Sequence, residues 1–224
     1  GRLQEAQVIV LSGPRAVGKS TVLRTLAGEL GREVVDLDDP ATRRAVAADP
    51  VRFLDGPRPV LVDEYARVPE SLDVVKSLLN RDGAPGQFVL AGSTRYGSVP
   101  AIGQALTGRA LVVPVLPLSQ GEITEQQESF VQRLVQGHDP RLADCALDRT
   151  DYAARVARGG LPNALRLPGA AARNRWFDQY LHLTLDKDVA EISKVRRRVM
   201  LPRLAALVAA RTAQLVNTAG MGQD

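Results

Sequence analysis

Apolar residues in the first half of the chain form short continuous runs, separated by segments with helical spacing. The runs suit strands that are buried on both faces of a parallel sheet. They lie near 7–11, 33–37, 59–63, 87–91 and 110–115. Apolar positions recur with helical spacing near 19–30, 41–48, 71–80 and 100–106. This alternation predicts an α/β fold, a parallel sheet with helices on both faces.

The pattern becomes helical after Pro117. Ser119 followed by Glu122 predicts a capping box at the start of a helix. Further helices are predicted near 151–158, 170–189 and 199–215. The chain therefore divides into an α/β domain, residues 1–118, and a smaller helical module, residues 119–224.

The turn after the first predicted strand carries a phosphate-binding pattern. Residues 13–20 contain Gly, four residues, Gly, Lys and Ser, between a strand and a helix as a P-loop requires. In such a loop Lys19 reaches the β- and γ-phosphates and the Ser20 hydroxyl is a ligand of Mg²⁺. The expected nucleotide contacts are Gly13, Pro14, Arg15, Ala16, Val17, Gly18, Lys19, Ser20 and Thr21.

The third predicted strand ends in two acids and resembles a Walker B strand. Asp63 is expected to hold Mg²⁺, directly or through water. Glu64 stands one residue further on, where a carboxylate can orient and deprotonate an attacking water. The alternative is a pair of surface acids that follow a strand.

The fourth predicted strand ends in a polar turn, Gly92-Ser93-Thr94. Nucleotide hydrolases with an Asp-Glu pair often carry, at the end of an extra strand, a polar residue that senses the γ-phosphate. Ser93 is the first candidate for that role and Thr94 the second. The alternative is a Ser/Thr turn that caps the next segment.

Composition and charge add little to these motifs. An apolar content of 45 % and a charged content of 24 % are ordinary for a globular protein. No apolar run approaches the ~18 residues of a membrane span, and no secretory signal is visible. The single cysteine, Cys145, suits a reducing cytoplasm. The net charge is +4, and the basic run 194–198 lacks interleaved aromatic residues, so a nucleic-acid partner stays unsupported.

Six motifs recur in an order that resembles a known family. They are 13–20, 60–64 followed by Val68-Pro69, 91–93, 106–109, 116–119 with Glu122, and 159–162. In this order they resemble the prokaryotic AAA-type ATPases, in which an ATPase domain precedes a C-terminal domain of unknown function. The resemblance implies a P-loop NTPase with strand order 5-1-4-3-2, ATP with Mg²⁺ as cofactor, and a winged-helix-like module. That module is expected to continue beyond Asp224, so the chain is expected to be truncated.

The resemblance also implies roles for two residues. Arg109 matches a Gly-Arg position that follows the sensor strand, and it is expected to bring positive charge to the γ-phosphate. The charge would act within the chain or across the interface of a homo-oligomer; the alternative is a surface salt bridge. Pro162 lies in a Gly-x-Pro element whose proline packs near adenine, although a proline that starts a helix gives the same pattern.

Three functions remain open at this stage. The first is an ATPase that acts as an ATP-driven switch, a role that is compatible with slow turnover. The second is a nucleotide-binding scaffold that does not hydrolyse ATP and serves a DNA- or protein-acting C-terminal domain. The third is a small-molecule kinase that uses the acids of 36–39, against which the Asp-Glu pair and the sensor strand argue.

Overall fold

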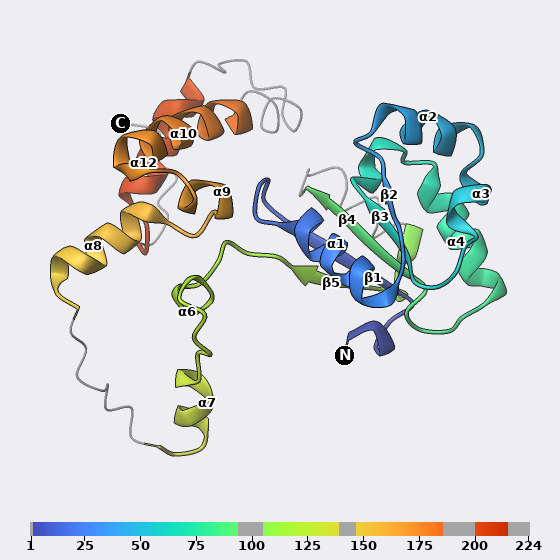
Figure 1. Cartoon of the computed structure of the whole chain (residues 1–224), viewed down its shortest axis with the longest axis horizontal. Helices are drawn as coiled ribbons and strands as arrows, with labels where there is room; N and C mark the ends of the chain where they lie inside the picture. Colours follow the sequence, from blue (N-terminus) through green and yellow to red (C-terminus); the bar gives the residue numbers. More distant parts are fainter. Residues whose placement is uncertain (1, 94–104, 139–146, 186–199, 215–224) are drawn as a thin grey trace. The chain divides into compact units, whose positions relative to one another are not determined.

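A computed structural model describes residues 2–93, 105–138, 147–185 and 200–214 (Figure 1). The contacts divide the chain into two compact units, Gly1–Leu167 and Pro168–Asp224. The first unit runs past the predicted domain boundary at residue 118. One reason is a backbone hydrogen bond in which Leu118 N donates to Gly160 O at 2.8 Å, which joins the two segments.

The first unit contains a five-stranded parallel sheet in the order β2-β3-β4-β1-β5. Seen from the other side, this is the predicted order 5-1-4-3-2. The strands are β1 (Val8–Gly13), β2 (Val34–Asp36), β3 (Val60–Asp63), β4 (Phe88–Ser93) and β5 (Ala110–Pro114). Each predicted strand is therefore confirmed. All five strands run the same way, so Gly13, Asp63 and Ser93 end at one edge of the sheet.

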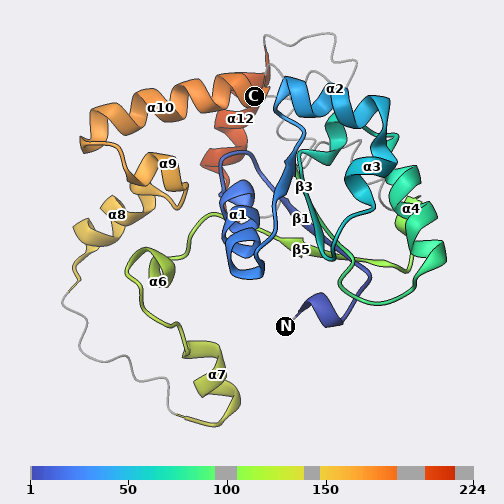
Figure 2. The ribbon, with the colours of Figure 1, turned by 45° about the vertical axis from the view of Figure 1, so that its right-hand side comes forward.

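Helices cover both faces of this sheet (Figure 2). They are α1 (Lys19–Leu30), α2 (Pro40–Ala48), α3 (Pro50–Leu54) and α4 (Ser71–Arg81). Along β1 alternate side chains enter different clusters, Val8 and Val10 on one face and Ile9 and Leu11 on the other. The Ile9 cluster contains Leu23 of α1, and the Val8 cluster contains apolar residues of α2, α3 and α4. The sheet is thus the middle layer of three.

One helix was not predicted, and one predicted helix lies mostly outside the described residues. The helix α3 was not predicted, because five residues are too few to show a helical period. Its start is nevertheless local, since Asp49 Oδ1 accepts from Arg52 N at 3.2 Å and Pro50 occupies the first turn. The helix predicted near 100–106 lies mostly outside the described residues, of which Ala105 and Leu106 are helical.

Short helices follow the sheet within the first unit. They are α6 (Gln120–Ile123), α7 (Phe130–Val135), α8 (Arg149–Arg158) and α9 (Pro162–Leu165). The predicted capping box is present: Glu122 N donates to Ser119 Oγ at 3.2 Å, and Ser119 N donates to Glu122 Oε2 at 2.8 Å. Two single 3-10 turns, η1 (Arg2–Gln4) and η2 (Tyr65–Arg67), lie before β1 and after β3.

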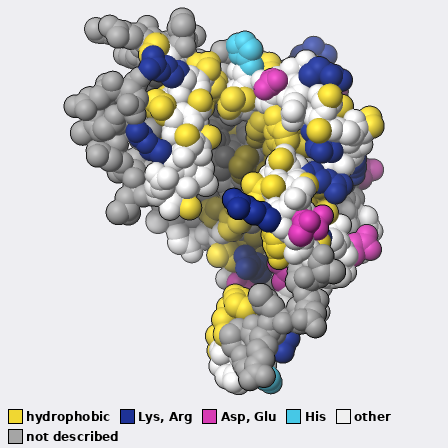
Figure 3. Space-filling view, turned by 90° about the vertical axis from the view of Figure 1, so that its left-hand side faces the viewer, with side chains coloured by type: hydrophobic (Ala, Val, Ile, Leu, Met, Phe, Trp, Pro, Cys, Tyr) yellow, Lys and Arg dark blue, Asp and Glu magenta, His cyan; other side chains and the backbone are white. Residues whose placement is uncertain are grey.

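The described part of the second unit is helical, as predicted, and consists of α10 (Gly169–Thr184) and α12 (Leu201–Ala210). Neither helix has a buried residue, and Trp176 stacks on Tyr180 with ring centroids 5.1 Å apart. Leu183 and Val208 are exposed apolar residues of these helices. Figure 3 shows apolar and basic side chains interspersed on one face of the protein. A winged helix stays a prediction, and the basic run 194–198 lies outside the described residues. No helix in the described segments is long and apolar enough to span a membrane.

Candidate nucleotide-binding site

The P-loop joins the end of β1 to the start of α1. Gly18 precedes the helix with φ 102°, a left-handed conformation that glycine adopts without strain. Lys19 follows as the first helical residue and is 6 % exposed. Its Nζ donates to the carbonyl oxygens of Gly13 at 2.9 Å and Pro14 at 2.7 Å. Burial lowers the pKa of Lys19, while the charges of Glu64 and Asp63 oppose that shift. Among the described residues, the hydrogen-bond partners of the ammonium group are thus these two neutral carbonyl groups.

Asp63 is the last residue of β3, and Glu64 follows it directly. In the sheet, β4 lies between β3 and β1. Asp63 is 3 % exposed, and its Oδ1 accepts a hydrogen bond from Glu64 N at 3.0 Å. Glu64 has φ 49° and ψ 43°, so the chain turns sharply and the two acids do not alternate as they would in a strand. Burial raises the pKa of Glu64, and the charges of Asp63 and Asp38 add to the rise, whereas Lys19 and Arg15 lower it.

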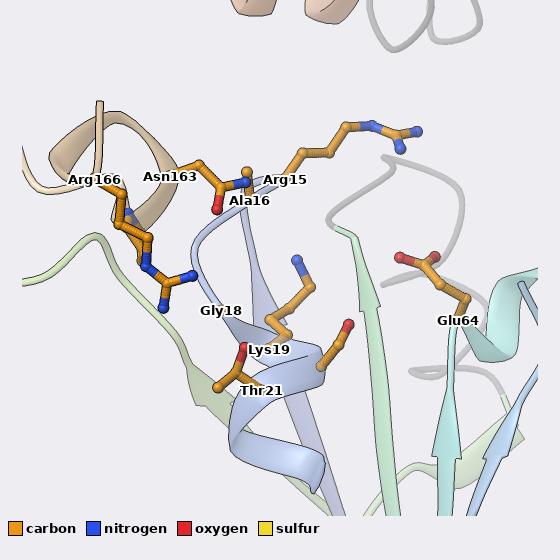
Figure 4. A pocket seen from close by; sticks show the side chains of 10 residues that line it. Arg15, Ala16, Gly18, Lys19, Thr21, Glu64, Asn163 and Arg166 are labelled. Atoms are coloured by element: carbon orange, nitrogen blue, oxygen red, sulfur yellow. The ribbon is translucent and has the colours of Figure 1, made fainter. Parts of the chain in front are cut away.

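A cleft of about 250 Å³ brings these segments together (Figure 4). Ten residues line it: Arg15, Ala16, Gly18, Lys19, Ser20, Thr21, Glu64, Pro162, Asn163 and Arg166. In Figure 4, α9 stands on one side of the P-loop and Glu64 on the other. The cleft is therefore open to an elongated ligand that crosses the P-loop from α9 to Glu64.

Most of the predicted contacts lie at this cleft, in different roles. The carbonyl groups of Gly13 and Pro14 hold Lys19, while Val17 is 3 % exposed and belongs to the core. Asp63 does not line the cleft itself but accepts a hydrogen bond from the backbone N–H of Glu64, which does. The backbone of Ser93 pairs with Gly13 in the β1–β4 register, which places the end of β4 beside the P-loop. The Ser93 side chain and Thr94 lie outside what the structure describes.

Two residues that line the cleft were not predicted as site residues. Asn163 stood inside the Gly-x-Pro element, and Arg166 follows α9 directly. Their side chains point toward the P-loop in Figure 4, Asn163 toward Ala16 and Arg166 toward Thr21. The one sequence signal for them was their distance of one and four positions from Pro162, and no local pattern linked α9 to a loop near the other end of the chain.

Arg109 lies at the opposite edge of the sheet. It precedes β5, and its carbonyl oxygen accepts a hydrogen bond from Val8 N, the first residue of β1, at 3.1 Å. It lines a separate cleft of about 490 Å³ together with Gln7 and Gly83. Arg109 therefore does not approach the P-loop of its own chain, because a residue that starts a parallel strand lies at the amino edge. Its action on the nucleotide of a neighbouring subunit stays a prediction.

The acids that follow β2 have structural partners. Asp39 Oδ2 accepts from Thr42 N at 2.7 Å and caps α2. Asp38 is paired with Arg67 at 2.9 Å, and Asp36 Oδ1 accepts from Asp38 N at 2.9 Å. These engagements weaken the hypothesis that residues 36–39 form the substrate site of a kinase.

The donor atoms near the cleft suit Mg²⁺ bound with phosphates. Mg²⁺ prefers oxygen ligands and is usually held by one or two protein groups together with substrate phosphates. The Ser20 hydroxyl and the Asp63 carboxylate are such groups. Within the described segments, no three His, Cys, Asp or Glu residues gather into a metal site of their own.

The sheet order and the P-loop cleft define a nucleotide-binding protein of the P-loop class. Residues 5–124 match the model of a family of AAA domains (AAA_14), and the chain belongs to this family. Residues 149–224 match the model of a domain of unknown function (DUF8612). The predicted combination of an AAA-type domain and a C-terminal domain of unknown function is confirmed.

Two curated relatives match most of the chain. The uncharacterized proteins Mb2031c of Mycobacterium bovis and Rv2008c of Mycobacterium tuberculosis are each 28 % identical to the chain over 193 residues. These residues are 85 % of this chain, which spans 38 % of the length of either relative.

Two solved structures are similar at low TM-scores. AMPPCP-bound DnaA from Aquifex aeolicus has a TM-score of 0.43 and 13 % identity, over 95 % of this chain and 75 % of that chain. A shikimate kinase from Acinetobacter baumannii in complex with shikimate has a TM-score of 0.29 and 16 % identity, over 95 % and 98 %.

Proposed function

We propose that this protein binds ATP with Mg²⁺, hydrolyses the ATP, and acts as an ATP-driven switch. One observation carries the proposal: the cleft that is lined by the P-loop is also lined by Glu64. A P-loop alone supports binding. A half-buried carboxylate in the same cleft, one residue after a buried Asp, adds the group that hydrolysis needs.

Each residue then has a distinct task. Lys19 exchanges its bonds to the Gly13 and Pro14 carbonyls for bonds to the β- and γ-phosphates, which match its positive charge better. Ser20 and Asp63 hold the Mg²⁺, which neutralises charge on the phosphates. Glu64 accepts a proton from the attacking water. The raised pKa of Glu64 suits a base, because a more basic carboxylate takes the proton more readily.

The base of the nucleotide is assigned to the α9 side of the cleft. Glu64 marks the γ-phosphate end, so the opposite end, lined by Pro162, Asn163 and Arg166, takes the nucleoside. Pro162 offers an apolar surface to the adenine ring. The Asn163 amide carries both a donor and an acceptor, as the polar edge of adenine does.

The proposal is tested by separating binding from turnover. Glu64→Gln is expected to keep ATP affinity and to lower phosphate release by about 10²-fold or more, because a carboxamide cannot accept the proton. Lys19→Ala is expected to weaken binding by roughly 10- to 100-fold, the loss of charge-assisted hydrogen bonds. Calorimetry measures the first quantity, and Mg²⁺-dependent release of phosphate measures the second.

Glu33→Gln is the matched control, since Glu33 is an exposed carboxylate that precedes β2. It is expected to leave both quantities unchanged. If Glu64→Gln hydrolyses ATP like the parent, Glu64 is not the base. Binding without any phosphate release by the parent would instead favour the scaffold hypothesis, and a phosphorylated small molecule would favour the kinase.

A further inference from the structure

The segment after Glu64 is a tight turn that leaves the sheet. Glu64 is in the left-handed region, and η2 follows at once, with Arg67 N donating to Glu64 O at 2.9 Å and Val68 N donating to Tyr65 O at 3.2 Å. A left-handed non-glycine residue costs free energy and persists only where its surroundings hold it. Something other than local preference must therefore stabilise the direction of the Glu64 side chain.

One support comes from the loop after β2. Arg67, the last residue of η2, donates from Nε to Asp38 Oδ1 at 3.1 Å, and its Nη2 lies 2.9 Å from the same oxygen in an ion pair. Asp38 is itself held in place, because its N–H donates to Asp36 Oδ1 at 2.9 Å and the neighbouring Leu37 N donates to Asp63 O at 3.2 Å. The guanidinium thus ties the end of the turn to a loop that is anchored beside Asp63.

A second support comes from β4. Tyr65 is 3 % exposed and lies against Gly92, where an added Cβ would come within 2.7 Å of Tyr65 Cε1. Tyr65, the residue after Glu64, therefore packs on β4, while Arg67 is paired with Asp38 in the loop after β2. Glu64 stands between the two supports, with its carboxylate in the cleft.

We propose that the Asp38–Arg67 ion pair is a positioning device for Glu64, which holds the turn after β3 so that the carboxylate faces the nucleotide. The inference rests on the proposed function, since it assigns Glu64 a direction that hydrolysis requires. Arg67 and Asp38 do not line the cleft, and Arg67 acts on Glu64 through the backbone of the turn. The pair is partly exposed, with side chains 38 % and 58 % accessible, so its effect on overall stability is small.

The test uses the full chain and the variants Arg67→Ala, Asp38→Asn and the charge reversal Asp38→Arg/Arg67→Asp. Each single variant is expected to lower kcat by about two- to fivefold, because an exposed ion pair favours one arrangement of the turn only by that order. Affinity for a non-hydrolysable ATP analogue is expected to change less than about twofold, since the pair does not touch the phosphates. The reversal restores part of the kcat, because the attraction between the two side chains returns.

Arg24→Ala is the matched control, because Arg24 forms an exposed pair with Asp36, 3.9 Å away, in the same region. It is expected to leave kcat unchanged. A general weakening of the fold would lower analogue affinity and melting temperature along with kcat, and the charge reversal would rescue nothing. That pattern overturns the proposal, as does an Arg67→Ala variant with the kcat of the parent.

Amide hydrogen exchange gives a measurement that does not depend on hydrolysis. In Arg67→Ala the amides of residues 67 and 68, which close η2, are expected to exchange about two- to fivefold faster, while those of the P-loop stay unchanged. Unchanged exchange at these amides overturns the positioning role whatever the activity. A parent protein that releases no phosphate overturns the proposed function, and the exchange result still decides whether the pair holds the turn.

Discussion

The two edges of the parallel sheet use buried polar groups in opposite ways. At the carboxyl edge, Lys19 is buried with carbonyl partners alone, and Glu64 is partly desolvated, so the pKa of each shifts toward its neutral form. At the amino edge, neutral amides bond to the backbone. Gln7 Nε2 donates to Gly83 O at 2.9 Å, and Gln87 Nε2 donates to the carbonyls of Asp82 and Ala84.

The difference separates a ligand site from a closure of the fold. Burying charged groups is costly even where, as for Lys19 and Glu64, opposite charges nearby oppose the pKa shift, and such groups cluster at ligand sites. The Nε2 groups of Gln7 and Gln87 join the strands to their loops, although the Oε1 atom of each is buried without a hydrogen-bond partner among the described residues. By this criterion the buried polar groups at the carboxyl edge form a ligand site, and those at the amino edge stabilise the fold.

Arg109 brings a buried cationic group to the amino edge. Its Nη1 is buried and has no hydrogen-bond partner in the part of the chain that the structure describes. A buried cationic group such as this resembles Lys19 at the carboxyl edge more than it resembles the neutral amides of the amino edge. Arg109 is therefore where the comparison is most easily broken.

The largest expected effect is that of Arg109→Ala. We expect this variant to bind ATP like the parent but to lose about 10³-fold or more in turnover, as removal of an arginine finger does. Because Arg109 is remote from its own P-loop, the charge must come from a neighbouring subunit. Turnover per chain is then expected to rise with protein concentration.

Mixing two inactive variants checks the origin of that charge. Arg109→Ala subunits mixed with Glu64→Gln subunits are expected to recover part of the phosphate release, because one shared site then holds both intact groups. Absence of recovery, with turnover that is independent of concentration, would contradict action between subunits. Parent turnover in Arg109→Ala would reduce the residue to a structural role.

A smaller effect is expected from Gln87→Ala at the amino edge. Gln87 is 1 % exposed, and its loss leaves two loop carbonyls without their donor. We expect the free energy of unfolding to fall by about 1–3 kcal/mol, measured with a denaturant, while ATP affinity stays unchanged. Ser77→Ala, on the exposed side of α4, is the control. A change in ATP affinity without a loss of stability would show that this edge also binds.

The smallest effect is expected from Asp39→Ala, which removes a cap near the carboxyl edge. Backbone and side-chain hydrogen bonds to Thr42 hold the pKa of Asp39 below its ordinary value. Since the folded pKa is depressed, the stabilisation is fully present above the pKa of the unfolded chain and is lost as the pH falls through the lower folded value. The melting temperature of Asp39→Ala should therefore lie slightly below that of the parent at pH 7, and the gap should close in acid.

ATP turnover in Asp39→Ala shows whether Asp39 only caps α2 or also takes part in the reaction. Asp39→Ala is expected to keep the kcat of the parent, because its carboxylate is bonded to the start of α2. A gap in melting temperature that persists unchanged at low pH would show that the ionised cap is not its source.

Local patterns in the sequence determined the elements and the core of the site. The five strands follow from apolar runs, and α1, α2 and α4 from helical spacing, because each pattern reports which side chains a single element buries. The P-loop is likewise local, since Gly18, Lys19 and Ser20 are adjacent and their chemistry depends on one turn. The Asp63-Glu64 pair was found for the same reason.

Tertiary structure alone decided which distant residues share a place. The arrival of Asn163 and Arg166 at the P-loop, and the pairing of Arg67 with Asp38 29 residues away, depend on the path of the whole chain. The same holds for Arg109, whose edge was set by the direction of β5 rather than by the motif around it. A local pattern reflects the surroundings of a single helix or strand. These contacts form only when several elements have packed together, so no periodicity or residue spacing in the sequence predicts them.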